Sequence, residues 1–262
     1  MSDRDGDESR EPKVEVLEGE DTGDASEQQG ERGIVLARHA YPPRLKIAPL
    51  NERPLFPRIR APLMIDEEPT KSTLIELVQS DEESSYVGAL LKRDPEKSRA
   101  SDGSPLSADD LYEVGCIAEI VRLGQQGPQS PLQALIVGMD RFRVTRWIRR
   151  EPPLEAEVEY ITDPETAADE ELKAYVVSII QSIKELVKLE PLHKEELSYF
   201  MSQSNVNEPG RLADFAAALT TADGSELQEV LEAVEVPKRV EKTLYLLKKE
   251  IEIAQLQQQI SK

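Results

Sequence analysis

Residues 111–144 read LYEVGCIAEIVRLGQQGPQSPLQALIVGMDRFRV, and this stretch sets the expected architecture of the chain. Residues 114–123 are rich in β-branched and apolar side chains, which favours a strand, and the GQQGP that follows predicts a turn. Residues 132–137 are apolar on both faces, as in a strand buried on both sides. The next tripeptide, GMD, predicts a second turn, and residues 142–148 begin a third strand. The stretch therefore predicts an antiparallel meander around which the rest of the chain is built.

Composition and charge restrict the class of protein. The chain has 262 residues, of which 51 are acidic and 32 basic, for a formal net charge of −19. Such a charge opposes non-specific binding of nucleic acid. Cys116 is the only cysteine, so no intrachain disulfide can form, and its place in an expected strand indicates a small buried apolar residue. The N-terminus has no apolar signal segment and no apolar run is long enough to span a bilayer, which predicts a cytoplasmic protein with no membrane segment.

Four segments are expected along the chain. Residues 1–43 form an acidic tail that we predict to be disordered, because its first 32 residues are polar, acidic and without aromatic side chains. Residues 44–162 form a β-rich unit, in which Pro49 suggests that the first strand lies at a sheet edge. Residues 163–236 form a helical bundle, and residues 237–262 start a long helix.

The helical part follows from a change of period after Asp163. One face of the first helix carries the apolar residues Leu172, Val176, Ile179, Ile183 and Leu186. A short helix is expected over 195–201, Asn207 is expected to cap the next helix, and Ser225 is expected to open a capping box with Gln228. These signals predict a bundle of short helices before the last one.

The last helix carries a coiled-coil-like seam. Apolar residues four and three positions apart occur at Val240, Leu244, Leu247, Ile251 and Ala254. One short bundle leaves part of such a seam uncovered, so we expect weak self-association through this helix.

No catalytic motif is found in the sequence. It contains no G-x-x-x-x-G-K-[ST] phosphate loop, no G-x-G-x-x-G after a strand and no G-x-S-x-G elbow. His39 and His193 are the only histidines, and neither lies near a cysteine or a carboxylate pair at metal-ligand spacing. We therefore predict no catalytic, cofactor-binding or metal-binding residue in this chain and expect a binding module.

The loop RPLFP at 53–57 supplies the candidate substrate-binding residues. Pro54 and Pro57 restrict the backbone around Leu55 and Phe56. Two apolar side chains on a rigid loop can bind exposed apolar segments of an unfolded chain with a small loss of entropy. The alternative is that Leu55 and Phe56 are packing residues that fill one end of the β-rich unit.

A group of arginines raises a second function. The arginines that surround Phe142 and Trp147 are Arg141, Arg143, Arg146, Arg149 and Arg150. Arginines interleaved with aromatic residues can follow phosphates and stack on bases, so this group is a candidate patch for RNA or DNA. Alternatively, the two aromatic residues pack into the core and the arginines pair with surplus acidic residues. The net charge favours this second interpretation.

Several stretches resemble the N-terminal domain of the ATP-dependent protease Lon. They are LYEVGCIA at 111–118, LIVGMDRF at 135–142, PLNERPLFP at 49–57, EPGRLAD at 208–214 and VPKRV at 236–240. The resemblance extends from about residue 44 to residue 262, whereas the acidic tail has no counterpart. Cys116 departs from the family pattern, in which threonine or serine is common at that position. The sequence stops inside the long helix and so looks like a fragment of a longer Lon chain.

The resemblance implies an α+β fold, with a PUA-like antiparallel β-barrel unit followed by a helical bundle and a protruding long C-terminal helix. It implies a substrate-recognition and assembly module of a bacterial Lon serine protease, an ATP-dependent endopeptidase that degrades misfolded or degron-bearing proteins. ATP and Mg would bind an ATPase domain that this chain lacks. The implied partners are unfolded or degron-bearing substrates and further copies of the chain, as a hexamer in the full-length parent. A stand-alone PUA-like module that binds RNA or DNA through 141–150 is the alternative.

Overall fold

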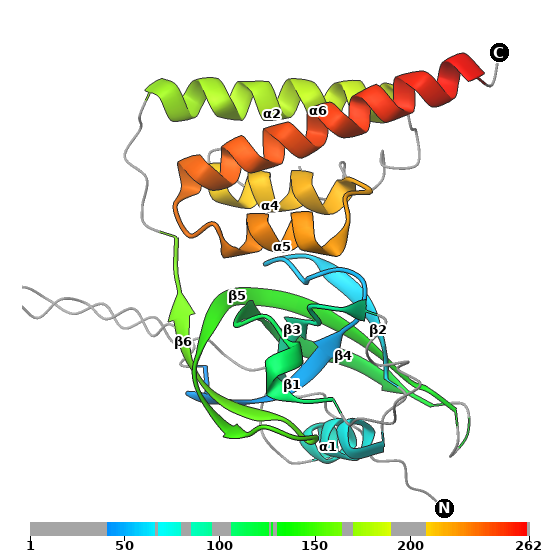
Figure 1. The fold of residues 1–262 in the computed structure, drawn as a ribbon, viewed down its shortest axis with the longest axis vertical. Helices are drawn as coiled ribbons and strands as arrows, with labels where there is room; N and C mark the ends of the chain where they lie inside the picture. Colours follow the sequence, from blue (N-terminus) through cyan, green and yellow to red (C-terminus); the bar gives the residue numbers. More distant parts are fainter. Residues whose placement is uncertain are drawn as a thin grey trace, which may run out of the picture. The chain divides into compact units, whose positions relative to one another are not determined.

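The computed structural model describes residues 41–65, 68–79, 85–95, 106–125, 127, 130–163, 170–189 and 208–260. Three expectations lie outside the described residues: the disordered tail as far as residue 40, the helix over 195–201 and the cap at Asn207. The described part combines one β-sheet with α-helices, which confirms the expected α+β class (Figure 1).

The strands form one six-stranded sheet whose pairings close on themselves. They are β1 (Arg44–Leu50), β2 (Arg60–Ile65), β3 (Tyr86–Leu91), β4 (Val114–Gly124), β5 (Leu132–Arg149) and β6 (Glu155–Ile161). The order is β2-β5-β4-β3-β1-β6, and β5 also pairs with β6. Five strands therefore form a ring, to which β2 is added along the first half of β5. β1 and β3 run parallel, so this pair departs from the expected antiparallel pattern.

β5 differs most from the sequence prediction. The sequence predicts a turn at 138–140, but β5 continues through these residues and is 18 residues long. Gly138 serves a close approach instead of a turn, because a Cβ atom there would collide with the carbonyl oxygen of Phe56. The Gly138 N–H donates to the Ile59 carbonyl at 2.9 Å, and its carbonyl accepts from the Arg58 N–H at 2.8 Å. The glycine thus lets the loop before β2 lie directly on β5.

β1 lies between β3 and β6, and not at the sheet edge that Pro49 suggested. The β6 pairing involves only the first residues of the strand, Arg44 to Lys46. Pro49 lies beyond that pairing, so its missing N–H interrupts no hydrogen bond to β6. Of the described strands, β2 pairs on one side only and is the edge strand.

The helices form a second layer. They are α2 (Glu170–Leu189), α4 (Pro209–Leu219), α5 (Gly224–Glu232) and α6 (Val236–Ile260), which we call the helical layer, while α1 (Glu68–Gln79) belongs to the sheet side. α6 packs along α2 and α4, and α5 contacts β4. α4 and α5 lie between the sheet and the α2–α6 pair (Figure 1).

The helix faces agree with the sequence more closely than the helix starts do. The predicted apolar residues Leu172, Ile179, Ile183 and Leu186 of α2 are buried. α4 has Glu208 at its N-cap position. α5 begins two residues earlier than predicted, because Asp223 is the N-cap and closes the capping box with Glu226. The sequence does contain a capping box at this position, but the predicted N-cap lies two residues too late.

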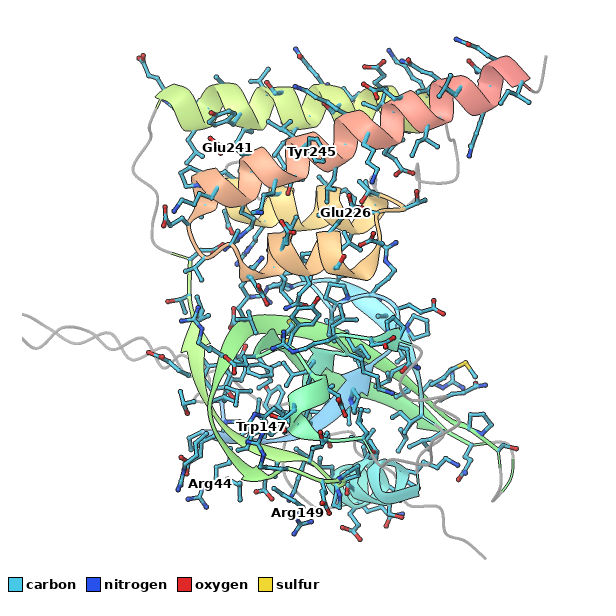
Figure 2. The ribbon with its side chains drawn as sticks, in the orientation of Figure 1. Arg44, Trp147, Arg149, Glu226, Glu241 and Tyr245 are labelled. Atoms are coloured by element: carbon cyan, nitrogen blue, oxygen red, sulfur yellow. The ribbon has the colours of Figure 1, made fainter. Side chains whose placement is uncertain are left out.

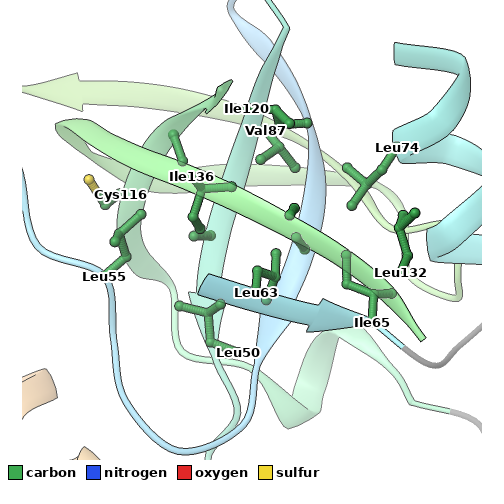
Figure 3. Packing of buried hydrophobic residues seen from close by; sticks show 14 of the residues in the cluster. Leu50, Leu55, Leu63, Ile65, Leu74, Val87, Cys116, Ile120, Leu132 and Ile136 are labelled. Atoms are coloured by element: carbon green, nitrogen blue, oxygen red, sulfur yellow. The ribbon is translucent and has the colours of Figure 1, made fainter. Parts of the chain in front are cut away.

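Apolar clusters fill the sheet and join it to the helices. One cluster lies within the sheet and includes Leu55, Cys116 and Ile136 (Figure 3). The complete burial of Cys116 confirms that it is a packing residue. Another cluster joins Phe56 to residues of β4, α4, α5 and α6. The two layers are therefore in direct apolar contact.

Candidate polypeptide-binding face

Leu55 and Phe56 of the loop at 53–57, the side chains predicted to contact substrate, lie inside the molecule. Leu55 packs in the sheet core, and Phe56, only 2% exposed, packs against the helical layer. Arg53 Nη2 donates to the carbonyls of Ala218 at 3.1 Å and Thr220 at 2.8 Å, at the end of α4. This loop joins the two layers, so the burial favours the packing alternative. Direct contact of Leu55 and Phe56 with substrate stays a prediction.

Exposed apolar side chains gather instead on the outer surface of β2, β5 and β4. Met64 is 58% exposed, Val121 57% and Leu135 37%. Leu135 lies opposite Pro62 of β2 on one side and Arg122 of β4 on the other. Residues opposite each other in a ladder share a face of the sheet, and Val121 is the additional residue at the bulge beside Arg122. We call Pro62, Met64, Val121 and Leu135 the apolar face.

The sequence contains a signal for this face in the apolar residues of β5. Residues 134–137 are apolar at successive positions, which favours burial on both sides of the strand 132–137. In the structure Ala134 and Ile136 point into the core, whereas Leu135 points outward, so burial on both sides was wrong. A strand that is apolar on both faces, but covered on one, leaves apolar surface in water, and such surface marks an interaction site.

The arginines between 141 and 150 do not form one free basic patch. Arg146 donates to both carboxylate oxygens of Glu157, at 3.0 and 2.7 Å, and these bonds lower the pKa of the Glu157 carboxyl. Glu157 also pairs with Arg44 at 3.4 Å. Arg150 pairs with a carboxylate oxygen of Asp109 at 2.6 Å. These acidic partners reduce the charge that a phosphate backbone would meet.

The aromatic residues between these arginines have packing roles. Phe142 is fully buried, and Trp147 is half-buried against the core of the strand ring. Trp147, Arg44 and Arg149 all belong to the part of the sheet unit that lies away from the helical layer (Figure 2). With its largest aromatic residues in the core, this surface has little to stack on bases, so the packing interpretation is favoured over nucleic-acid binding.

A set of four charged side chains, buried except for Asp163, joins β5 to the helical layer. Arg141 donates to both carboxylate oxygens of Asp214 in α4, at 2.9 and 2.5 Å, and its Nε donates to the Leu231 carbonyl at 3.0 Å. Arg239 of α6 donates to both carboxylate oxygens of Asp163, at 2.8 and 2.7 Å. The Arg239 Nη1 also lies 3.7 Å from Asp214 Oδ2. We call Arg141, Asp163, Asp214 and Arg239 the ionic junction.

The ionic junction predicts a pH dependence through Asp163. Burial raises the pKa of the Asp163 carboxyl, but the hydrogen bonds and charge of Arg239 outweigh it, so the pKa lies below its ordinary value. A lowered pKa in the folded state gives stability above the unfolded pKa, about 4, that is lost as the pH falls through the folded pKa. We expect Asp163→Asn to lower the free energy of unfolding at pH 7. The difference from the parent should shrink below about pH 4, as measured by urea unfolding.

If Asp163→Asn lowered the free energy of unfolding by the same amount at pH 7 and below about pH 4, this assignment would be contradicted. Other carboxyls titrate in parent and variant alike, so the difference between the two proteins isolates Asp163.

Among the residues that the structure describes, no group of three or more His, Cys, Asp and Glu side chains is arranged to hold a metal ion. His39 and His193 lie outside the described residues. No helix in the described ranges is long and apolar enough to cross a bilayer.

Comparison with known proteins identifies similar sequences. The protein-family model of the ATP-dependent protease La (LON) substrate-binding domain matches residues 44–249. The Lon protease of Protochlamydia amoebophila is 40% identical over 220 residues, which are 84% of this chain and 25% of that protein. Lon protease 1 of Syntrophotalea carbinolica is 34% identical over 263 aligned residues, or 98% of this chain and 31% of that protein. The chain thus spans about a quarter to a third of the length of these relatives.

Solved structures share the fold. The N-terminal domain of the Mycobacterium avium complex Lon protease aligns with a TM-score of 0.55 at 17% identity, covering 78% of this chain and 98% of that one. The Lon N-terminal domain protein from Xanthomonas campestris aligns with a TM-score of 0.51 at 16% identity, covering 77% and 97%. At such identities the likeness concerns the arrangement of strands and helices.

Proposed function

Because the chain belongs to the family of the ATP-dependent protease La (Lon) substrate-binding domain, we propose that it recognises protein substrates through the apolar face. The proposed substrates are misfolded or degron-bearing proteins, since their unfolded segments present apolar side chains that folded proteins bury. The observation that carries the proposal is the exposure of Met64, Val121 and Leu135 on neighbouring strands.

The supporting strands make this face a rigid one. The inward residues of the same strands, Leu63, Ile65, Ala134 and Ile136, are buried in the sheet core. A face held by strands whose other side is packed loses little conformational freedom on binding. The apolar face therefore offers apolar groups that are both fixed and exposed. The loop at 53–57 does not, because Leu55 and Phe56 are buried.

Substitution of the apolar face tests this proposal. The variant Met64→Ser/Leu135→Ser should bind a permanently unfolded polypeptide, such as a reduced and alkylated protein, about tenfold more weakly than the parent. Both side chains are exposed, so the midpoint of unfolding should change little. Fluorescence anisotropy of the labelled polypeptide measures the affinity.

A matched control is available in the helical layer. Val177 of α2 and Tyr245 of α6 are exposed to an extent similar to the residues of the apolar face, but lie on helices (Figure 2 labels Tyr245). The variant Val177→Ser/Tyr245→Ser should keep the parental affinity. Equal weakening by both pairs of substitutions, or by neither, would reject the apolar face as the binding site.

We further propose a place for this module within a larger protein. ATP hydrolysis and peptide-bond cleavage are proposed to be the work of other parts of a hexameric Lon serine protease in the bacterial cytoplasm, with ATP and Mg bound there and no cofactor bound by this module. Within the module, we propose a sheet unit over 44–162, a helical bundle over 163–236 and the long helix from residue 237, after an acidic tail over 1–43. The pairing of the arginines leaves nucleic acid as a weaker candidate ligand.

We propose that copies of the chain associate weakly through the end of α6. The seam predicted for this purpose is covered, because Val240, Leu247, Ile251 and Ala254 pack against the rest of the helical layer. The exposed apolar residues of α6 include Leu256 and Ile260. They lie four positions apart and so share one side of the helix, where a second copy can cover them.

Sedimentation velocity tests this part of the proposal. The parent should show a concentration-dependent increase in sedimentation coefficient, and Leu256→Ser/Ile260→Ser should reduce it, because the substitutions remove the apolar contact. Glu252→Gln, in the same exposed part of α6, serves as the control. A parent that sediments as the same monomer at low and high concentration would rule out this association.

A further inference from the structure

The ionic junction lies where four separate parts of the fold meet. Arg141 comes from β5, Asp163 follows β6, Asp214 lies in α4 and Arg239 in α6. Arg141, Asp214 and Arg239 are almost completely buried, and the two positive and two negative groups balance each other. We propose that the ionic junction sets the orientation of the helical layer on the sheet, and that the apolar contact between the layers holds them together.

Apolar contact alone does not define this orientation. The cluster around Phe56 joins the layers through aliphatic and aromatic side chains, and such contact is non-directional. A buried ion pair can often be replaced by apolar residues at no loss of stability, because desolvation offsets its attraction. What the pair adds is geometry, since a guanidinium meets a carboxylate through two parallel hydrogen bonds in one plane.

Each arginine of the junction fixes more than one element. Arg141 holds the carboxylate of Asp214 in α4, and its Nε holds the carbonyl of Leu231 in α5. Its single guanidinium therefore sets both helices against β5. A rotation of the helical layer would break these hydrogen bonds together.

Arg239 does the same for the start of α6. It binds the carboxylate of Asp163, and its Nε donates to the Ala233 carbonyl at 2.9 Å. Gly210 leaves the space for this contact, because a Cβ atom there would meet the Asp163 carboxylate and the Arg239 guanidinium. The chain leaving the sheet and the first turn of α6 are thereby held at one point.

The junction also links the orientation of α6 to the position of Leu135. Leu135 and Arg141 lie six positions apart on one continuous strand, β5. A displacement of the ionic junction would therefore change the direction of α6 relative to that strand. This inference concerns the arrangement of the two layers and does not depend on which face binds substrate.

Distance measurements between the layers test the inference. Spin labels are placed at cysteines introduced for Ile148 of β5 and Val177 of α2, both exposed, while the native Cys116 is buried and unreactive. In the full chain, Arg141→Met/Asp214→Leu replaces one ion pair by apolar residues and leaves Arg239 paired with Asp163. We expect this variant to fold and its distance distribution to broaden by about twofold or more.

The matched control is Lys242→Met/Glu229→Leu, which removes an exposed ion pair between α6 and α5 and should keep the parental width. An unchanged width in the folded Arg141→Met/Asp214→Leu variant would overturn the inference. If that variant does not fold, Arg141→Lys decides, because it keeps the charge but loses the planar fork. A broadened distribution in Arg141→Lys supports the inference, and a parental distribution rejects it.

Discussion

Replacing Phe56 with alanine should lower the free energy of unfolding by about 3–5 kcal/mol. The Phe56 side chain is 2% exposed and packs in the cluster that includes Val114, Leu227, Val230 and Leu246. These neighbours come from the sheet and from helices, so no single element can move in to fill the space left by the ring. Urea unfolding followed by the fluorescence of Trp147, the only tryptophan, measures the change.

The same variant separates the two interpretations of the loop at 53–57. A packing role predicts a much lower unfolding midpoint. A substrate-contact role predicts an unchanged midpoint with weaker binding of an unfolded polypeptide, and that result would contradict our assignment of Phe56 to the interior. Met64→Ala, an exposed apolar truncation in the next strand, is the stability control and should stay within about 0.5 kcal/mol of the parent.

Local periodicity predicted the regular elements well. The apolar stripe of α2 and the apolar seam of α6 each correspond to a buried face in the structure. These patterns arise from neighbours in the sequence, so a single chain displays them without any knowledge of its partners. The resemblance to Lon N-terminal domains is confirmed by the family match over 44–249 and by the relatives at 34–40% identity.

Contacts between distant segments could not be predicted in this way. Arg141 meets Asp214 across 73 positions, and Arg239 meets Asp163 across 76. The sequence indicated that Arg141 either belongs to a surface patch or pairs with an acidic residue. It could not identify Asp214 as the partner, because the two residues are remote in the chain. The turn predicted at Gly138 is wrong for the same reason, since the Phe56 carbonyl that excludes a side chain there is remote in sequence.

The motifs that carried the family resemblance have a common structural role. Gly138 and Arg141 belong to LIVGMDRF, Gly210 and Asp214 to EPGRLAD, and Arg239 to VPKRV. All five lie at contacts within the sheet or between sheet and helices. These motifs therefore report mainly how the layers fit together. Of the apolar face, Leu135 belongs to LIVGMDRF, whereas Pro62, Met64 and Val121 lie outside the motifs. Leu55 and Phe56, the binding residues predicted from the motif PLNERPLFP, accordingly lie in the interior.

Removing the shared carboxylate of the ionic junction should be as damaging as removing Phe56. Asp214 is 1% exposed, accepts two hydrogen bonds from Arg141 and lies 3.7 Å from Arg239. Asp214→Asn keeps the size of the side chain but leaves two buried guanidinium groups with Asp163 as the one remaining carboxylate of the junction. Breaking a buried ion pair from one side costs about 3–5 kcal/mol, because the remaining charge stays desolvated.

Urea unfolding at pH 7 measures this loss against an exposed pair. Glu229→Gln breaks an exposed ion pair, in which Glu229 Oε2 lies 2.6 Å from Lys242 Nζ. This substitution should cost about 0–1 kcal/mol. Burial, and not charge pairing as such, separates the two expected values. If Asp214→Asn were as mild as Glu229→Gln, the guanidinium groups of Arg141 and Arg239 would have to reach water in the variant. The contact between the layers at the ionic junction would then not exclude water.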